Sequence, residues 1–451
     1  MDGRMESGMI YRRWWAICLS ALAALGLIAG LSIAVARAAL TGDDPNWPRV
    51  APRNASESPD DEALQPSIAS NGLGRLAIVW RDRQTGDEMQ QIYASLSNDD
   101  GQTWSTPAAI STTLKNSRLP DVAFTGERAF AVWVDGDSPP SIEMYEAEIG
   151  VTSVRSISSP IELDITQARI AASAERVHIV FNAESSGQIY HASRILTDTA
   201  WPLAQKVYTS ASGAFSSSPA VAVGPTGDTV HVVWEESSMM GEGEVFVMYI
   251  TGTVQQAAGV AWYTPITLSE IITQAYRPGV VVDSQGVAHF AWGEVGAAGK
   301  QEEQYVWYAR YLDGSVAPVL RIDPERVLVN DKTPTFVTPD ITLHEDEGET
   351  TVCITWHGFR PGASSEEEIL ISCSSDGGAS WTGPHNVSQS SGDEIAQGLR
   401  SIRSSVASDA AGRQHVVWQE QSGENAWEIY HTYGLNNTVY LPLVMRAGRG
   451  G

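Results

Sequence analysis

One sequence unit recurs along the chain and most constrains how the chain can fold. The unit is an apolar β-type stretch, a short gap rich in Gly or polar residues, and a second β-type stretch that usually ends in Trp. Repetition at this spacing predicts an architecture that stacks equivalent structural units. The copies occupy residues 66–80, 120–133, 169–181, 219–234, 278–292, 339–356 and 404–418.

Two further strands are expected in most units. A third β-type stretch follows the Trp, for example at 91–95, 188–193, 305–310 and 428–433. A fourth follows in most units, for example at 104–111, 262–269 and 381–388. Short antiparallel four-stranded sheets repeated radially are the blades of a β-propeller. We therefore predict an all-β fold, a seven-bladed β-propeller of four-stranded antiparallel blades, with six blades as the alternative.

The last unit lacks a fourth strand, so another segment must close the ring. Residues 47–56, WPRVAPRNAS, resemble a fourth strand with no partners before it, and pairing it with the last unit would remove a free sheet edge. Residues 438–444, TVYLPLV, compete for the same place. The Trp-Pro start of the N-terminal segment matches the other fourth strands and favours it. Residues 438–451 then form a tail or a partner-binding strand.

The N-terminus predicts export from the cytoplasm. Residues 14–36 are uncharged and long enough to cross a bilayer as a helix, and Arg12 and Arg13 precede them. The small residues that end the run also fit a signal-peptidase site, so a membrane anchor and a cleaved signal peptide both remain open. The expected organisation is a cytoplasmic N-terminus (1–13), the hydrophobic helix (14–36), a linker (37–46), the propeller (47–437) and the C-terminal strand or tail (438–451).

The charge excludes two classes of partner. With 54 acidic and 29 basic side chains, the formal net charge is −25, which repels nucleic acid and anionic lipid. Acidic runs at 344–350 and 365–368 leave a structural calcium ion open, although neither has ligands at alternate positions, and solvated loop charge is favoured. No other cofactor is expected. The histidines show no ligand spacing, so no metal site is predicted.

An octapeptide occurs twice, as SNDDGQTW at 97–104 and SSDGGASW at 374–381, each between a third and a fourth strand. In such a turn the Asp accepts bonds from backbone N–H groups, the Gly permits a positive φ, and the Trp packs back between sheets. All three roles are structural. The residues are Asp99, Gly101 and Trp104 in the first copy and Asp376, Gly378 and Trp381 in the second.

The octapeptide resembles the Asp box, or BNR repeat, of the sialidase superfamily. Thr103 also matches this pattern, and Ser380 replaces it in the second copy. The resemblance covers roughly residues 47–437 and implies that the boxes lie on the face opposite the functional site. It also implies an arginine triad for a carboxylate, a Tyr nucleophile with a Glu base, and an Asp acid. Sialidase enzymes have six blades, so an expected count of seven argues against catalysis.

Basic residues gather at the starts of the first strands. Arg118, Arg277 and Arg403, together with Tyr276 beside Arg277, are the ligand-binding candidates, and Arg169 and Arg400 lie nearby. A guanidinium binds a carboxylate through two parallel hydrogen bonds, so these residues could converge on one anion. The segment SRLP at 117–120 is similar to the family's Phe-Arg-Ile-Pro motif, but it lacks the Phe and has Leu for Ile. The alternative is that the arginines pair with neighbouring acids.

The resemblance does not allow a catalytic role to be assigned to any particular residue of this chain. Tyr276, beside Arg277, is available as a nucleophile, but no spacing singles it out. Acids that stand two residues after a second-strand Trp repeat round the ring, which favours a bracing role in turns. They are Asp82, Asp135, Glu236, Glu294 and Glu420.

Two of the cysteines, Cys353 and Cys373, are expected on paired strands of the sixth unit and would face one another. Outside the cytoplasm they could form a disulfide. Simple packing is the alternative, because Ala77 and Leu96 occupy the matching positions in the first unit.

These observations favour a non-catalytic extracytoplasmic recognition module for a glycan or a cell-surface protein. An exo-acting glycoside hydrolase of sialidase type that uses the arginines is the alternative. A third hypothesis is an architectural propeller that assembles through its tail.

Overall fold

The structure is a computed structural model that describes residues 47, 49–58, 62–84, 88–111, 115–136, 143–149, 154–156, 165–183, 185–198, 201–211, 213–237, 244–255, 259–269, 274–295, 303–323, 327–328, 337–359, 367–389, 400–423 and 426–434. The chain divides into two compact units, Met1–Pro48 and Arg49–Gly451, and the strands named below belong to the second. Every helix or strand element in the described residues is a β-strand. None of those residues forms a helix long and apolar enough to span a membrane. The predicted segments 14–36 and 438–451 lie outside the described residues.

Short antiparallel sheets make up the fold. Four of the sheets in the described residues keep four consecutive strands in chain order. They are β2 (Leu64–Ser70), β3 (Leu76–Asp82), β4 (Gln91–Ser97), β5 (Ala108–Ala109); β6 (Ser117–Thr125), β7 (Arg128–Asp135), β8 (Glu143–Ile149), β9 (Val154–Ser156); β10 (Ile165–Ala172), β11 (Arg176–Ala183), β12 (Gln188–Ile195), β13 (Gln205–Lys206); and β25 (Asp340–Asp346), β26 (Glu349–Phe359), β27 (Glu367–Ser374), β28 (His385–Asn386). A fifth combines β1 (Arg53–Asn54) with β29 (Ser401–Ser408), β30 (Gln414–Gln421) and β31 (Trp427–Tyr433).

The remaining strands form one eleven-stranded sheet that has two antiparallel parts. A single parallel pair, Val245 with Gln274, joins the two parts. The first part holds β14 (Phe215–Val223), β15 (Thr229–Ser237), β16 (Val245–Gln255), β17 (Gly259–Trp262) and β18 (Ile266–Thr267). The second holds β19 (Gln274–Val282), β20 (Ala288–Val295), β21 (Glu303–Leu312), β22 (Ser315–Val316), β23 (Leu320–Arg321) and β24 (Val327–Leu328).

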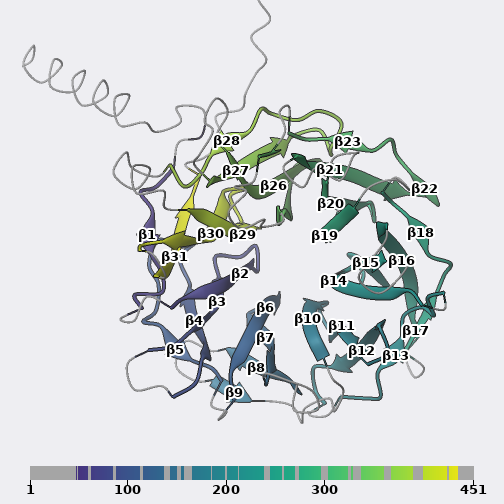
Figure 1. Ribbon diagram of the computed structural model, residues 1–451, viewed down its shortest axis with the longest axis horizontal. Helices are drawn as coiled ribbons and strands as arrows, with labels where there is room; N and C mark the ends of the chain where they lie inside the picture. The colour runs from purple at the N-terminus through teal and green to yellow at the C-terminus, as the bar shows by residue number, and fades with distance from the viewer. Residues whose placement is uncertain are drawn as a thin grey trace, which may run out of the picture. The chain divides into compact units, whose positions relative to one another are not determined.

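The first strand of each antiparallel set belongs to a closed inner ring. These strands contact one another in the order β2, β6, β10, β14, β19, β25, β29 and back to β2. Figure 1 shows the sheets arranged round a common centre, with strands such as β2, β6, β10 and β14 nearest to it. The all-β, propeller-type architecture predicted from the repeats is therefore present.

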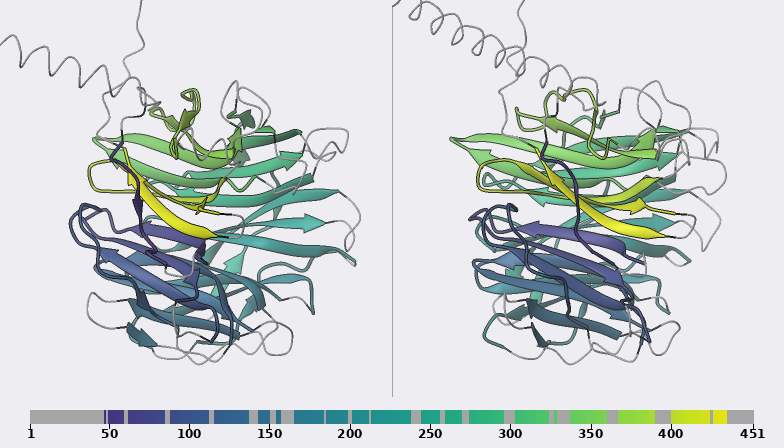
Figure 2. Two further views of the ribbon diagram at one scale, coloured as in Figure 1. Left: turned by 60° about the vertical axis from the view of Figure 1, so that its left-hand side comes forward. Right: turned by 90° about the vertical axis from the view of Figure 1, so that its left-hand side faces the viewer.

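An N-terminal strand closes the ring, as the sequence favoured. In β1, Arg53 pairs with His431 and Asn54 with Tyr430 of β31. The backbone N–H of Val50 also donates to Tyr433 O (3.0 Å), so the pairing extends beyond β1. Both views of Figure 2 show β1 beside β31. This contact joins the two ends of the described fold and removes a free edge from the last sheet.

The core lies between neighbouring sheets. Trp80 of β3 packs with Val417 and Ile429 of the preceding sheet, and Trp356 of β26 packs with Tyr308 of β21. Burying one aromatic side chain of this size contributes roughly 3 kcal/mol. The repeated Trp of the sequence unit thus supplies inter-sheet packing. The second-strand tryptophans exposed by at most 1% are Trp80, Trp234, Trp292, Trp356 and Trp418.

The first octapeptide fastens its sheet to the preceding one. Asp99 accepts bonds from the backbone N–H (2.8 Å) and hydroxyl (2.6 Å) of Thr103. The Trp104 ring lies 4.9 Å from that of His431, on the preceding sheet. Gly101 has a φ of 75°, and a Cβ there would lie 2.6 Å from His415. A glycine is therefore needed both for the turn and for the close approach between sheets.

The second octapeptide repeats this geometry. Asp376 accepts the Ser380 backbone N–H (2.8 Å) and hydroxyl (2.5 Å), so Ser replaces Thr without loss of the hydroxyl bond. Burial opposes ionisation of Asp376, but the bonds from Ser380 and Ser374 lower its pKa to about 2. The Trp381 ring lies 4.8 Å from that of Tyr308 on the preceding sheet. The octapeptide is thus a structural turn used twice.

Candidate functional site

The inner strands bulge at matching positions near their starts. The pairing register shifts between Leu64 and Ser67, for example, and between Tyr276 and Gly279. At five of these bulges a non-glycine residue has a positive φ between 47° and 58°. Such a backbone costs on the order of 1–3 kcal/mol per residue and tends to occur where it serves a function. We call these residues the bulge rim: Gln65, Leu119, Ser218, Arg277 and Arg403.

The bulge rim and the octapeptides lie at opposite ends of the strands. The bulges are near the starts of the first strands, whereas the octapeptides follow β4 and β27, the third strands of their sheets. In an antiparallel sheet the first and third strands run in the same direction. The end of a third strand is therefore remote from the bulge rim.

Unpaired guanidinium groups gather at the bulge rim. Arg277 and Arg403 belong to it and are exposed, and Arg118 immediately precedes Leu119 of the rim. Arg81 ends β3 just after Trp80 and is partly buried. None of these four arginines forms an ion pair with an acid among the described residues. In a chain with a formal net charge of −25, four neighbouring arginines without an ion pair among the described residues are unexpected.

Electrostatic interactions connect these four arginines. Although part of the Arg403 side chain is exposed, the protein around its guanidinium partly desolvates it and lowers its pKa, and the charges of Arg277 and then Arg81 lower it further. Burial likewise lowers the pKa of Arg81, which the charge of Arg118 lowers further and that of Glu62 raises. Like charges lower a guanidinium pKa only at short range, so the two members of each of these pairs lie near one another. Their order is Arg277, Arg403, Arg81, Arg118.

The other two arginines of the sequence-based set behave differently from the candidates. Arg400 forms an ion pair with Glu367, the pairing with a neighbouring acid that sequence reasoning held open for the whole group. Arg169 lies on β10 and is partly buried. The Arg118 guanidinium donates to a backbone oxygen, that of Gly136. For Arg118, Arg277 and Arg403, the expected pairing with acids is absent from the described residues.

Side chains of the neighbouring sheets hold the bulge rim in place. Glu235 accepts the backbone N–H of Arg277 (2.7 Å) and the hydroxyl of Ser217 (3.0 Å). Gln419 accepts the backbone N–H of Gln65 (2.8 Å) in the equivalent position of another pair of sheets. Both residues immediately follow a second-strand Trp, as Arg81 does. The residue after the Trp therefore reaches the next bulge, a signal that sequence reasoning overlooked.

Three of the five acids that stand two residues after a Trp bind that Trp directly. Asp82 accepts the indole N–H of Trp80 (3.3 Å), and Glu236 accepts that of Trp234 (3.1 Å). Glu420 accepts the indole N–H of Trp418. Each therefore braces the buried aromatic residue of its own strand.

Tyr276 is buried, and its phenol is hydrogen-bonded to another side chain. It is 6% exposed, and its hydroxyl donates to Gln304 Oε1, which also accepts the Val337 N–H (2.7 Å). Burial, and then the charges of Glu235 and Glu294, raise its pKa well above the ordinary value. A phenol that is buried and hard to ionise is a poor nucleophile.

His357 is a buried histidine close to two of the arginines of this region. It follows Trp356 and is 1% exposed, and its Nε2 has no hydrogen-bond partner among the described residues. Burial, and then the charges of Arg400 and Arg403, lower its pKa to about 3. The imidazole is therefore neutral at physiological pH and adds no charge to the arginines.

Two carboxylates lie among the inner strands themselves. Asp121 of β6 accepts the Ser67 hydroxyl (2.9 Å) and the Ile170 N–H (2.9 Å), and Asp340 of β25 accepts the Val406 N–H (2.9 Å). Burial raises the pKa of Asp340, and the charge of Asp121 raises it further. Both link inner strands of different sheets. No group of three or more metal-ligating side chains is present in the described part of the chain.

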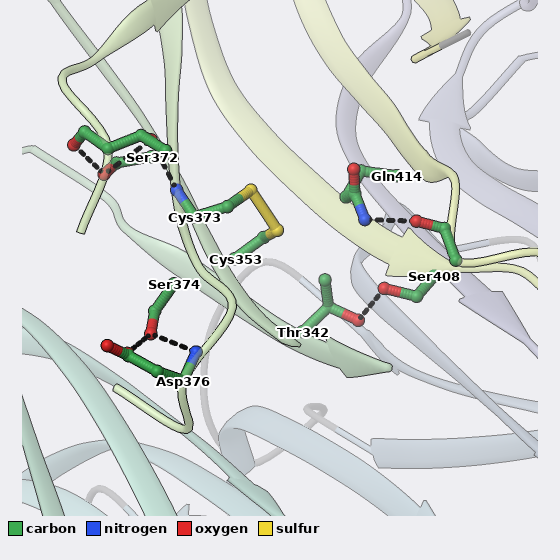
Figure 3. The surroundings of a disulfide bond; sticks show 10 residues. Thr342, Cys353, Ser372, Cys373, Ser374, Asp376, Ser408 and Gln414 are labelled. Atoms are coloured by element: carbon green, nitrogen blue, oxygen red, sulfur yellow. Dashed lines mark hydrogen bonds between the residues drawn. A yellow bond between two sulfur atoms is a disulfide. The ribbon is translucent and has the colours of Figure 1, made fainter. Parts of the chain in front are cut away.

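Cys353 and Cys373 form a disulfide. They are directly opposed on β26 and β27, with Cα atoms 4.1 Å apart. Figure 3 shows the bond beside Thr342 and Ser408, whose hydroxyl groups lie 3.3 Å apart and link this sheet to the last one. The disulfide thus cross-links β26 and β27, in the sheet that contacts the last sheet of the ring.

The fold resembles solved structures at low sequence identity. An ulvan lyase of a polysaccharide lyase family, bound to -[GlcA(1-4)Rha3S]-, aligns with a TM-score of 0.55 and 9% identity over 84% of this chain and 95% of that chain. A protein of unknown function from Dyadobacter fermentans gives 0.51 and 11% over 86% and 99%. The phage phi92 endosialidase gives 0.50 and 12% over 90% and 71%. These likenesses show a sialidase-like β-propeller fold.

The similarity to these solved structures is one of fold and not of sequence. No protein-family profile matches the chain, and no curated protein is significantly similar in sequence.

Proposed function

We propose that this chain is a seven-bladed sialidase-like propeller that acts outside the cytoplasm as a recognition module for an anionic glycan. Each sequence repeat is one blade, and the two octapeptides are Asp boxes. The ligand binds at the bulge rim, where Arg81, Arg118, Arg277 and Arg403 contact its acidic groups.

One observation carries the proposal: these arginines have no acidic partner among the described residues of a strongly acidic protein. Taking a guanidinium partly out of water without a partner costs free energy, so a fold that retains several gains from an external anion. Carboxylate and sulfate suit the planar donor fork of arginine. The disulfide is consistent with an oxidising compartment.

The recognition role is favoured over catalysis because of Tyr276. Its phenol is buried and donates to the Gln304 side chain, an amide that cannot serve as a general base. The runner-up is an exo-acting glycoside hydrolase of sialidase type, which the same arginines would serve by holding a substrate carboxylate.

Binding to a panel of acidic and neutral glycans tests the proposal. We expect the purified full-length protein to bind acidic glycans, and the double variant Arg277→Gln/Arg403→Gln to lose at least about tenfold in affinity. Arg75→Gln is the control for the change made at each position: it removes one positive charge in the same way, but Arg75 pairs with Glu127 (3.5 Å) beyond the end of β2 that is remote from the bulge. Undiminished binding by the double variant would place the ligand elsewhere.

A hydrolysis assay separates the two functions. We expect no turnover of methylumbelliferyl glycosides, the sialoside included. Turnover of the sialoside that disappears in Arg277→Ala would establish the hydrolase instead.

A further inference from the structure

We infer that the bulge rim binds an extended chain with at least two anionic groups, rather than one terminal carboxylate. This inference rests on the proposed function and names the class of its ligand: an acidic oligosaccharide or polysaccharide that lies across several inner strands.

The positions of the arginines on the ring argue for an extended ligand. Arg277 is on β19, Arg403 on β29, Arg81 at the end of β3 and Arg118 on β6. In ring order, β25 lies between β19 and β29, and β2 lies between β29 and β6. Neighbouring sheets pack roughly 10 Å apart, less near the centre of a ring. The four guanidinium groups therefore span an arc of the inner ring instead of facing a single point.

The interactions among the arginines follow the same order. Arg403 is affected by Arg277 and Arg81, whereas Arg81 is affected by Arg118. Each of these interactions joins two arginines that are successive along the arc. Each guanidinium repels mainly its neighbour along the arc, and successive negative charges on one ligand would relieve that repulsion.

Hydrogen-bonding capacity leads to the same ligand class. One carboxylate offers about four lone-pair positions, and each bidentate guanidinium takes two of them. Two bidentate arginines therefore fill one carboxylate, or three if some bind through a single bond, so four arginines exceed one carboxylate and match two anionic groups. The exposed Arg277 and Arg403 would take one group, and the partly buried Arg81 and Arg118 the next.

Length-defined ligands test the inference on the full-length protein. Oligogalacturonides of one, two and four residues carry carboxylates, κ-carrageenan oligosaccharides carry sulfates, and malto-oligosaccharides of equal length are neutral controls. We expect affinity for one of the acidic series to rise at least about tenfold from the shortest to the tetrasaccharide, because the second group binds intramolecularly. The series that shows this rise identifies the anionic group.

Single substitutions distinguish arginines that are spread along an arc from arginines that converge on one anionic group. Arg118→Gln and Arg277→Gln stand at opposite ends of the arc, so each should lower affinity for the tetrasaccharide by about fivefold to tenfold. At most one of them should affect the monosaccharide. Arg75→Gln is the charge control, and unchanged thermal unfolding shows that each variant is folded.

Two results would overturn the inference. If affinity does not depend on length in either series, or if Arg118→Gln and Arg277→Gln weaken binding of the monosaccharide equally, the arginines converge on one group, and only this inference fails. If no acidic saccharide of any length binds, the proposed function fails with it.

Discussion

Replacing Gly378 with alanine tests the role of the octapeptide as a fastening between sheets. Gly378 has a φ of 89°, and a Cβ there would overlap the Tyr308 ring and hydroxyl. Tyr308 cannot move away freely. Its hydroxyl lies 2.7 Å from His289 Nδ1, and its ring packs against Trp381.

The expected loss has two parts. A left-handed backbone costs a non-glycine residue about 1 kcal/mol, and an overlap in a packed interface adds roughly 2 kcal/mol. Gly378→Ala should therefore lower the free energy of unfolding by about 3 kcal/mol. The control is Gly286→Ala: its φ of 81° is similar, but no atom lies within 4 Å of the added Cβ. It should lose only about 1 kcal/mol.

Urea unfolding followed by tryptophan fluorescence measures both variants. The difference between them, about 2 kcal/mol, isolates the contact with the neighbouring sheet from the backbone effect. Equal losses in the two variants would refute the fastening role and leave the octapeptide as an ordinary turn.

Three further outcomes are expected. Removing the disulfide with Cys353→Ala/Cys373→Ala should cost about 3 kcal/mol of stability, because the bond closes a loop with a sequence separation of 20; equal urea midpoints with and without it would contradict this. Burial, with a smaller effect of Arg176, lowers the pKa of His178 from 6.5 to about 4. As the pH falls, the unfolded chain therefore takes up this proton before the folded chain does. The stability from His178 is full above about pH 6.5 and is lost between pH 6.5 and 4, by about 3 kcal/mol, and a flat profile of unfolding midpoint against pH would argue against neutral burial. Arg400→Gln should leave acidic-glycan affinity unchanged within about twofold, because Arg400 pairs with Glu367, and a loss as large as that of Arg403→Gln would extend the arc to this residue.

Local sequence patterns account for most of the predicted fold. The recurring Trp marks buried second strands because every sheet packs its aromatic residue in the same way. The closing strand at 47–56 was recognisable because it copies the start of other fourth strands. The octapeptides were recognisable because the bonds that Asp99 and Asp376 accept within the turn all fall within eight residues.

The site was less accessible to sequence reasoning because its contacts are between sheets. Arg118, Arg277 and Arg403 stand beside repeat starts and could be proposed from the sequence, whereas Arg81 could not. The position directly after the Trp varies from repeat to repeat, so no sequence pattern marks Arg81. Arg400 and Glu367 are 33 residues apart and pair only because β27 and β29 pack together. Tyr276 was placed correctly on its strand, but its burial against Gln304 depends on β21.

A crystal structure of the full-length protein with an oligogalacturonide tetramer tests the central claim most directly. The account predicts a ligand on the bulge rim, with one carboxylate at Arg277 and Arg403 and a second at Arg81 and Arg118. A tetramer bound in solution but located on another surface of the propeller would contradict the account.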